Sequence, residues 1–198
     1  MPRLLSDYVK VYDGMLAPAR CDALIAQFEA AAPLHERMAA ERSYNFVELN
    51  VSRHWPDVEA QVLDVMMRAV RRYWEELDVG TAWPTKVWAE KVRMKRYLPG
   101  GAESFAPHVD VMNDAQSRRF LTAILYLNAP GGGETVFPGL EVSVAPAPGR
   151  LLIFPPLWLF QHAGLPPRDA PKYILHRYLW YPPASESSHP ANRPQPVG

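Results

Sequence analysis

Apolar residues recur at helical spacing in the N-terminal part of the chain. After an alternating stretch, YVKVYDGML (residues 8–16), Pro18 stands where it would open a helix whose apolar stripe ends at Phe28. A second helix is expected from about Asp57 to Leu77, where an apolar stripe is bordered by Arg and Glu on the remaining surface. Residues 1 to about 80 are therefore expected to contain strand and helix and to form the N-terminal helical support.

From Trp83 onward the pattern changes to short β-prone runs separated by Pro and Gly. Runs such as FLTAILYLN, RLLIF, WLFQHAG and KYILHRYLWY are bounded by breakers such as LPGG, APGGG and GLPPRDAP. About eight short strands with turn signals between them favour a closed or layered β-fold. We predict a mainly β protein, with a double-stranded β-helix (jelly-roll) core at 83–181 and N-terminal α-helices packed on one sheet.

The length of 198 residues fits one globular domain, which we place at residues 1–181. The remaining stretch, PPASESSHPANRPQPVG (182–198), lacks apolar periodicity and is rich in proline. Such a segment cannot bury enough apolar surface to offset its ordering entropy, so we expect it to be disordered.

Composition narrows the classes of partner and compartment. Lys and Arg number 21, as do Asp and Glu, so no basic surface for nucleic acid is indicated. Cys21, the one cysteine, excludes an intrachain disulfide and fits a buried helix position. No leader and no apolar run of membrane-spanning length is evident. We expect a cytoplasmic protein without membrane or nucleic-acid partners; the sequence gives no indication of oligomeric state.

The stretch FAPHVDVMN (105–113) places an imidazole and a carboxylate, His108 and Asp110, on one face of an extended segment. His162 and His176 also fall on expected strands. Two histidines and one carboxylate on a rigid scaffold are the ligand set of a non-haem iron(II) site with open positions. A His-X-Asp pair alone is also a common chance pattern of an edge strand, so both interpretations stay open at this point.

Further motifs follow in a specific order. They are MKRYLPGGAESFAPHVD, LTAILYLNAPGGGETVFPG, VAPAPGRLLIFPP and HAGLPPRDAPKYILHRYL, and Lys172 follows His162 by ten residues. In these pieces the sequence resembles the iron(II)- and 2-oxoglutarate-dependent oxygenases, specifically their prolyl 4-hydroxylase-like branch. The resemblance covers roughly residues 8–181 and is strongest from 92 to 181.

The resemblance implies that His108, Asp110 and His162 are catalytic residues that hold Fe(II) and leave positions for 2-oxoglutarate and dioxygen. Related halogenases replace the carboxylate with a small residue, so Asp110 favours hydroxylation. The implied reaction hydroxylates an unactivated C–H bond and decarboxylates 2-oxoglutarate to succinate and CO2, with ascorbate as an accessory reductant.

The resemblance also assigns the co-substrate pocket. Lys172 would pair with the distal carboxylate of 2-oxoglutarate, Tyr126 would donate its hydroxyl to the same carboxylate, and Tyr97 would line the pocket. Relatives usually carry threonine where His176 stands and often tryptophan where Tyr178 stands. His176 would contact substrate, hydrogen-bond the co-substrate or be a satisfied core histidine, and the sequence leaves these three open.

The substrate is less defined than the reaction. A prolyl residue of a peptide, a free amino acid and another small metabolite are all consistent with the motifs, since a fold does not choose a substrate. Lys91, Arg93 and Lys95 alternate on one expected strand and fit a solvated charged face. Alternatively, Arg93 or Lys95 stands at the pocket mouth and favours an anionic substrate. The competing function is a non-catalytic, cupin-like metal-binding or sensing jelly-roll protein.

Overall fold

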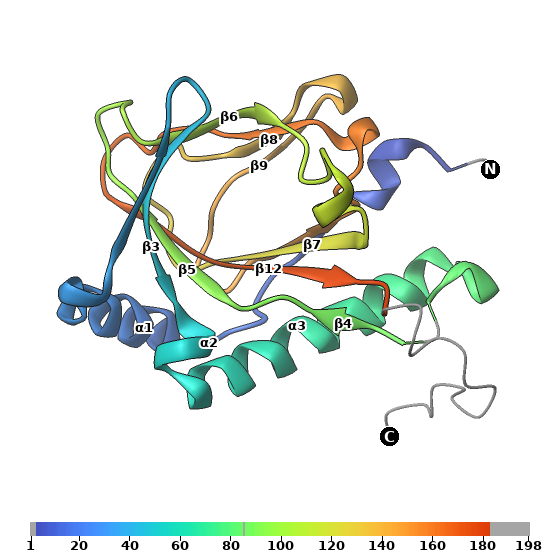
Figure 1. Ribbon diagram of the computed structural model, residues 1–198, viewed down its shortest axis with the longest axis horizontal. Coiled ribbons are helices and arrows are strands. Elements are labelled where there is room, and N and C mark those ends of the chain that lie inside the picture. Colours follow the sequence, from blue (N-terminus) through green and yellow to red (C-terminus); the bar gives the residue numbers. More distant parts are fainter. Residues whose placement is uncertain (1–2, 85, 183–198) are drawn as a thin grey trace.

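A single strongly curved antiparallel sheet dominates the computed structural model (Figure 1). The structure describes residues 3–84 and 86–182, and this part of the chain contains a 12-stranded sheet. Its strands are β1 (Lys10–Tyr12), β2 (Glu36–Ala40), β3 (Tyr44–Asn50), β4 (Trp88–Ala89), β5 (Arg93–Tyr97), β6 (Ser104–His108), β7 (Arg119–Tyr126), β8 (Thr135–Phe137), β9 (Val142–Val144), β10 (Leu151–Phe154), β11 (His162–Gly164) and β12 (Lys172–Trp180). Apart from Pro182, the tail expected to be disordered lies outside the described residues.

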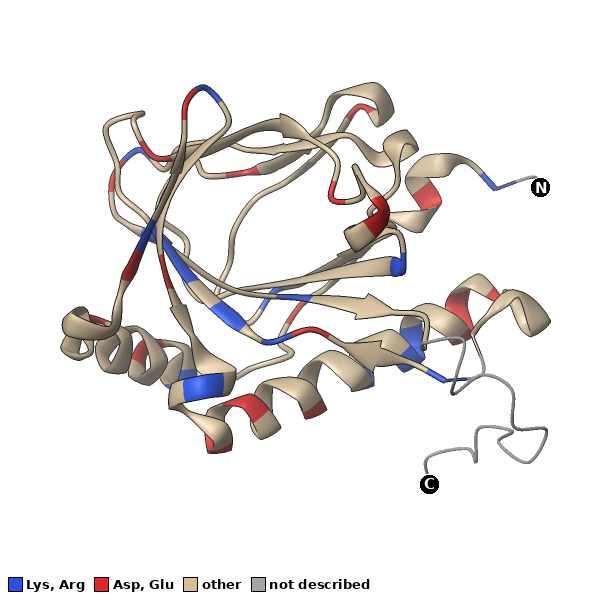
Figure 2. Cartoon of the chain, in the orientation of Figure 1, with Lys and Arg blue, Asp and Glu red and all other residues tan. Residues whose placement is uncertain are grey.

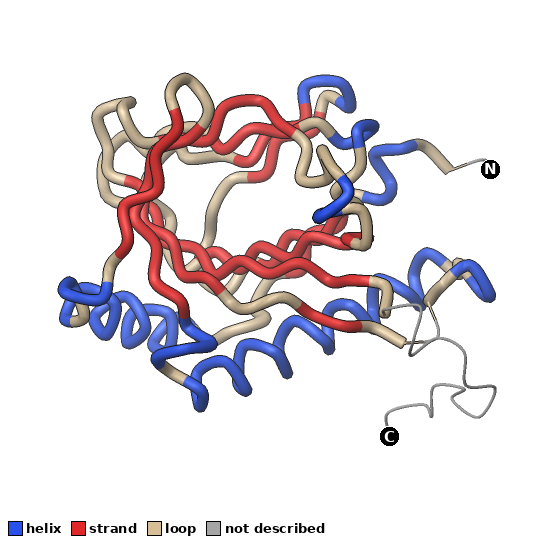
Figure 3. The backbone as a smooth tube through the Cα atoms, viewed as in Figure 1, coloured by secondary structure: helices blue, strands red, loops and turns tan. Residues whose placement is uncertain are grey.

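The sheet folds over on itself so that two layers face each other. The strand order is β1-β10-β7-β12-β5-β3-β6-β11-β8-β9, with β2 paired to β3 and β4 paired to β12. Strand β3 pairs with β5 through residues 47–50 and with β6 through residues 44–45, so it passes from one layer to the other. Figure 3 shows the strands enclosing a central space. This nearly closed antiparallel barrel confirms the predicted mainly β, jelly-roll fold class.

Two helices, α1 (Pro18–Ala30) and α3 (Pro56–Leu77), lie against the outside of the β5–β12–β7 layer, and the short α2 (Val51–His54) links β3 to α3 (Figure 1). Leu24 and Phe28 of α1 share one buried core with Leu49 and Leu175 of the sheet. The helix expected over 57–77 is therefore confirmed, and it starts at Pro56, whose missing N–H costs nothing at that position. Short 3-10 helices are η1 (Leu5–Tyr8), η2 (Ala32–Leu34), η3 (Gly80–Ala82), η4 (Asp114–Gln116), η5 (Pro138–Leu140) and η6 (Trp158–Phe160).

Residues 36–50 form β2 and β3, two strands that the sequence pattern did not reveal. Val47 and Leu49 of β3 pack in the core beneath the helices, whereas Phe46 belongs to the core inside the barrel. Both faces are covered, so the apolar–polar alternation that would reveal a strand is lost. The expected strand at WLFQHAG also begins later, because residues 158–160 form a 3-10 helix and β11 starts at His162.

A second buried cluster fills the space between the two layers. It is rich in aromatic residues, including Phe46, Tyr97, Tyr126, Phe137 and Phe154. This inner cluster forms the walls around the polar residues described below. Within residues 3–84 and 86–182, no helix has both the length and the apolar character required to cross a membrane.

Candidate active site

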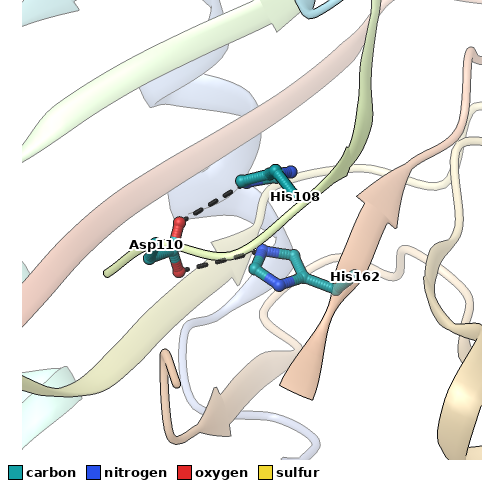
Figure 4. Close-up of side chains that lie close together, drawn as sticks. All are labelled: His108, Asp110 and His162. Atoms are coloured by element: carbon teal, nitrogen blue, oxygen red, sulfur yellow. Dashed lines mark ion pairs between the residues drawn. The ribbon is translucent and has the colours of Figure 1, made fainter. Parts of the chain in front are cut away.

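Two neighbouring strands of one layer bring His108, Asp110 and His162 together (Figure 4). His108 is the last residue of β6 and pairs directly with His162, the first residue of β11. Asp110 lies in the bend that follows β6. One ligand atom from each residue lies within 4.8 Å of the others, so the group could hold one metal ion.

Hydrogen bonds to the backbone fix the orientation of both imidazoles. Nδ1 of His108 lies 2.8 Å from the Ala106 carbonyl oxygen, and Nδ1 of His162 lies 3.0 Å from that of Phe160. Since a carbonyl only accepts, each Nδ1 carries the proton and each Nε2 presents a lone pair. These Nε2 atoms lie 3.4 Å (His108) and 3.8 Å (His162) from the oxygens of Asp110. Lone pairs facing a carboxylate repel one another, and a divalent cation between them removes the repulsion.

The local electrostatics keep His162 and Asp110 in the protonation states that a metal requires. Burial lowers the pKa of His162 to about 4, although Asp110 acts in the opposite direction. Burial alone would raise the pKa of Asp110, but the imidazoles of His108, His162 and His176 hold it below its usual range. At neutral pH the site therefore contains a neutral His162 and an ionised carboxylate.

Two hydroxyl groups fix the carboxylate of Asp110. Tyr178 donates to Oδ1 and Thr122 donates to Oδ2, each at 2.8 Å. Arg119 donates to the Asp110 carbonyl oxygen, and its guanidinium lies 3.7 Å from the centroid of the Tyr178 ring. Tyr178 was noted in the sequence as a departure from relatives, whereas Thr122 and Arg119 were missed, because no local motif marks them.

The metal-binding group opens into a pocket between the two layers. All the site residues expected from the sequence line this pocket. They are His108, Asp110, His162, Lys172, Tyr126, Tyr97 and His176. Figure 1 shows that these residues come from distant parts of the chain, since β5, β6, β7, β11 and β12 all contribute.

One end of the pocket is formed around Lys172. Its Nζ donates to the Gly133 carbonyl oxygen at 3.0 Å and lies 4.6 Å from the centroid of the Tyr97 ring. Burial lowers the pKa of Lys172 to about 8. Among the described residues no carboxylate lies within ion-pairing distance of it. The hydroxyl of Tyr126 donates to Thr135 at 2.6 Å in the same region, and Thr135 is a further pocket residue that the sequence analysis did not single out.

His176 and Lys95 complete the pocket lining. His176 is buried and its ring meets that of Tyr178 edge-on, with centroids 4.4 Å apart. It has no hydrogen-bond partner among the described residues, so the structure does not show the satisfied core histidine. The sequence pattern indicated a solvated charged face for this strand. That interpretation is wrong at Lys95, which is only 8% exposed, whereas Lys91 is exposed as expected. Closure of the barrel, which local sequence does not reveal, buries Lys95.

Comparisons with known proteins place this site in a family. The family model described as the 2OG-Fe(II) oxygenase superfamily matches residues 92–180, which span the pocket strands from β5 to β12. The viral collagen prolyl hydroxylase of Paramecium bursaria Chlorella virus-1, solved with 2OG, superposes with a TM-score of 0.66 at 27% identity. The match covers 87% of this chain and 95% of the viral one. The part of the chain that forms the pocket, residues 92–180, is therefore that of a 2OG-Fe(II) oxygenase.

Further solved structures show the same fold. A prolyl 4-hydroxylase of Pseudomonas putida matches with a TM-score of 0.63 at 18% identity, covering 89% of this chain and 94% of its own. A Trichoplax adhaerens prolyl hydroxylase, solved with a peptide of the hypoxia inducible factor oxygen degradation domain, matches with a TM-score of 0.69 at 16% identity. The match covers 89% of this chain and 84% of the Trichoplax one. No curated protein sequence matches the chain significantly.

The oxygenase therefore lies in the prolyl hydroxylase-like branch and is an oxidoreductase of the hydroxylase type. Membership of the family implies Fe(II) and 2-oxoglutarate as cofactor and co-substrate. The competing expectation of a non-catalytic, cupin-like protein loses its support.

Proposed function

We propose that this oxygenase hydroxylates an unactivated C–H bond and couples the reaction to decarboxylation of 2-oxoglutarate to succinate and CO2. The observation that carries the proposal is the continuity of one buried pocket. It joins the His108, Asp110 and His162 group to an ammonium, Lys172, that has no carboxylate partner among the described residues. The active region is assigned to a single domain, residues 1–181.

His108, Asp110 and His162 are proposed as the ligands of Fe(II). The donor set fits this ion, because two imidazole nitrogens and one carboxylate leave positions free for small oxygen ligands. When bound, Fe(II) supplies the activation of dioxygen that accompanies oxidative decarboxylation of the co-substrate. The carboxylate of Asp110 occupies a position that a halide would need, which favours hydroxylation.

Lys172 and Tyr126 are proposed to bind the distal carboxylate of 2-oxoglutarate. The ammonium and the phenol hydroxyl line the same end of the pocket, and Thr135 is within hydrogen-bond distance of that hydroxyl. A carboxylate there replaces the weak partnership of Lys172 with carbonyl oxygens by an ion pair. Burial raises the pKa of Tyr126, so its hydroxyl stays protonated and donates.

The surrounding residues orient the ligands and exclude water. Tyr178 and Thr122 hold the two oxygens of Asp110, while Phe137 and Phe154 pack against the His162 ring with centroids 5.6 and 4.6 Å away. Tyr97 forms the wall beside Lys172. A rigid, largely apolar site keeps solvent from the reacting groups and strengthens the electrostatic contacts inside it.

The substrate is proposed to be a prolyl residue of a peptide or a free amino acid. The names of similar structures, a collagen prolyl hydroxylase and a prolyl hydroxylase with a bound peptide, support the first choice. Ascorbate is proposed as an accessory reductant, and the site of action as the cytoplasm.

Succinate production tests the proposed activity. Purified protein with Fe(II), ascorbate and 2-oxoglutarate in air should release succinate, detected by proton NMR, at a rate that vanishes on chelation of the metal. His162→Ala should lose the activity, and Lys172→Ala should lower it by about 100-fold or more at low 2-oxoglutarate, because a buried ion pair loses one partner. Metal-independent succinate release, or equal rates in wild type and His162→Ala, would contradict the proposal.

A further inference from the structure

Lys95 is a second buried ammonium in the pocket, and the proposed activity does not use it. Lys95 lies on β5, is 8% exposed and lines the same cavity as His108, Asp110 and His162. Figure 2 shows β5 as a strand with several basic residues (blue) in the middle of the sheet. In the described part of the chain, no side chain or carbonyl accepts a hydrogen bond from Lys95, and no carboxylate lies within 4.0 Å of its Nζ.

The closest contacts of the Lys95 ammonium are aromatic, and the carboxylate of Glu48, which stands opposite Lys95 on β3, forms no ion pair with it. Its Nζ lies 4.6 Å from the centroid of the Phe46 ring and 5.8 Å from that of Phe105. Phe105 in turn stacks on His108, with ring centroids 3.8 Å apart, which brings the ammonium close to the metal-binding group. Glu48 is buried nearby, but its ion pair at 3.3 Å is with Arg93. Cation–π contacts stabilise an ammonium less than a carboxylate partner does inside a protein.

Counting charges shows what the pocket lacks. Iron(II) and Asp110 together carry one net positive charge, Lys172 and Lys95 add one each when protonated, and the charge of Glu48 is offset by Arg93. The two carboxylates of 2-oxoglutarate neutralise two of these three charges. One positive charge remains in a site of low dielectric, where an uncompensated charge is costly. A carboxylate placed directly against Lys95 would therefore be bound favourably, and this local pairing also holds for a zwitterion whose ammonium lies away from Lys95.

The co-substrate does not need Lys95. Its distal carboxylate is assigned to Lys172 and Tyr126, and its other end to the metal. Tyr97 is the last residue of β5 and is paired with Lys172 of β12. Lys95 lies two positions earlier on β5 and is paired with Ile174, so it stands away from the Lys172 end of the pocket. The next inward position on β12 is His176, which offers an imidazole without a hydrogen-bond partner in the described residues. Lys95 and His176 thus form a polar region of the pocket distinct from the Lys172 end.

From these observations we propose that the primary substrate is a small carboxylic acid, a free amino acid being the leading example, whose carboxylate pairs with Lys95. The proposal rests on the function proposed above and chooses between the two substrate classes named there. A residue within a peptide chain has its carboxyl group converted to an amide, so it supplies no such charge. Burial lowers the pKa of Lys95, and binding of a carboxylate beside it restores the charged form.

The test compares acids with their neutral amides. Free L-amino acids and short aliphatic acids, their amides, and a prolyl peptide blocked at both ends are first screened for stimulation of succinate release. Calorimetry then gives the Kd of the best acid and of its amide for protein loaded with Mn(II) and 2-oxoglutarate, which binds without turning over. Wild type is compared with Lys95→Met and with Lys91→Met, an exposed lysine on the preceding segment.

We expect the acid to bind wild type about 100-fold more tightly than its amide, because the amide cannot form the ion pair. Lys95→Met should remove this preference, Lys91→Met should retain it, and the Kd for 2-oxoglutarate should stay within about threefold of wild type in both. If Lys95→Met does not fold, the inference is tested instead by Lys95→Gln and by the ratio of the Kd of the amide to that of the acid in wild type.

Three results would overturn the inference. They are equal binding of acid and amide, stimulation by the blocked peptide alone, and a large loss of 2-oxoglutarate affinity in Lys95→Met without substrate, which would make Lys95 a co-substrate residue. Wild type that binds no 2-oxoglutarate at all would instead contradict the proposed function, so the two failures are distinguishable.

Discussion

Lys172 illustrates how burial prepares a single residue for its ligand. Its ammonium has only carbonyl oxygens as hydrogen-bond acceptors, at 3.0 and 3.5 Å, and burial lowers its pKa to about 8. A carboxylate would form a stronger, charge-assisted hydrogen bond than these carbonyls do. The residue is therefore poised to accept an anion, and its titration predicts how binding depends on pH.

Binding of 2-oxoglutarate should weaken as pH rises above about 8. In the folded protein the pKa of Lys172 is lowered to about 8, so its ammonium is present below this pH and is lost above it. Above pH 8, binding of 2-oxoglutarate must therefore be accompanied by uptake of a proton. The Kd should rise by about tenfold per pH unit above pH 8. Calorimetry on Mn(II)-loaded protein between pH 6.5 and 9.5 measures this. Lys172→Arg, whose guanidinium stays charged, should give a flat profile. A flat wild-type profile would show that Lys172 does not bind the co-substrate.

Tyr178 is predicted to position Asp110, one of the proposed metal ligands. Its hydroxyl donates to Oδ1 at 2.8 Å, and burial raises its pKa so that it remains a donor. Tyr178→Phe should weaken Mn(II) binding by about 10- to 100-fold, the usual effect of removing a group that orients a metal ligand. Tyr181→Phe, at an exposed position, is the control. Calorimetric titration with Mn(II) measures both, and equal affinities would contradict the assigned role of Tyr178.

At this scale the sequence predicts residues that belong to spaced motifs and misses those that do not. His108, Asp110, His162 and Lys172 were singled out from their order and spacing, and the structure brings them into one pocket. Thr122 carries no such signal, and Lys95 entered only as an alternative to a solvated charged face. Lys95 alternates with other basic residues, a pattern that locally resembles a solvated face, and only the long-range pairing of β5 with β3 and β12 buries it.

Among the elements, the turn between β7 and β8 has a direct effect on the co-substrate pocket. Gly133 has φ +74, in the left-handed region, and a Cβ there would lie 3.0 Å from Cδ of Lys172. The glycine is thus required both by the turn and by the packing of the lysine stem.

Gly133→Ala should weaken 2-oxoglutarate binding by about tenfold and destabilise the fold by about 1–2 kcal/mol, because it strains the turn and displaces Lys172. Gly139→Ala is the matched control, since a Cβ at that position meets nothing within 4 Å. Calorimetry and thermal denaturation of the two variants measure these effects. Indistinguishable 2-oxoglutarate affinities would mean that the turn does not position Lys172.

Elements with a strong local pattern were predictable and those without one were not. The apolar stripe of α3 gave its position to within a residue, since that helix has one buried and one exposed side. Strand β3 was missed because both its faces are covered, by helices outside and by the aromatic cluster inside. Its role in joining the two layers depends on pairing with β5 and β6, which are more than forty residues away.

The whole molecule consists of two layers that meet around the proposed binding site. His108 and His162 belong to one layer, and Lys172 to the other, whose outer face is supported by α1 and α3. The motifs were sufficient to predict a jelly roll, but the closure of the barrel follows from long-range pairing that no local pattern contains. Ligands bound at the centre should therefore stabilise the fold as a unit.

Metal and co-substrate together should raise the Tm. At concentrations about 100 times each Kd, linkage predicts a gain of about 2.7 kcal/mol for each ligand and so about 5.4 kcal/mol for the two, or about 11–22 °C for a chain of this length. Differential scanning calorimetry with Mn(II) and 2-oxoglutarate measures the shift. His162→Ala should show almost none, and an equal shift in that variant would place the binding site elsewhere.

Anaerobic titration of the Fe(II)-loaded protein with 2-oxoglutarate tests the central claim most directly. Simultaneous binding of iron and the co-substrate's keto acid at one site is expected to produce a weak visible charge-transfer band. The band should saturate at one equivalent, be absent in His162→Ala, and require much higher 2-oxoglutarate in Lys172→Ala. A folded, iron-loaded wild-type protein that shows no band would contradict the account.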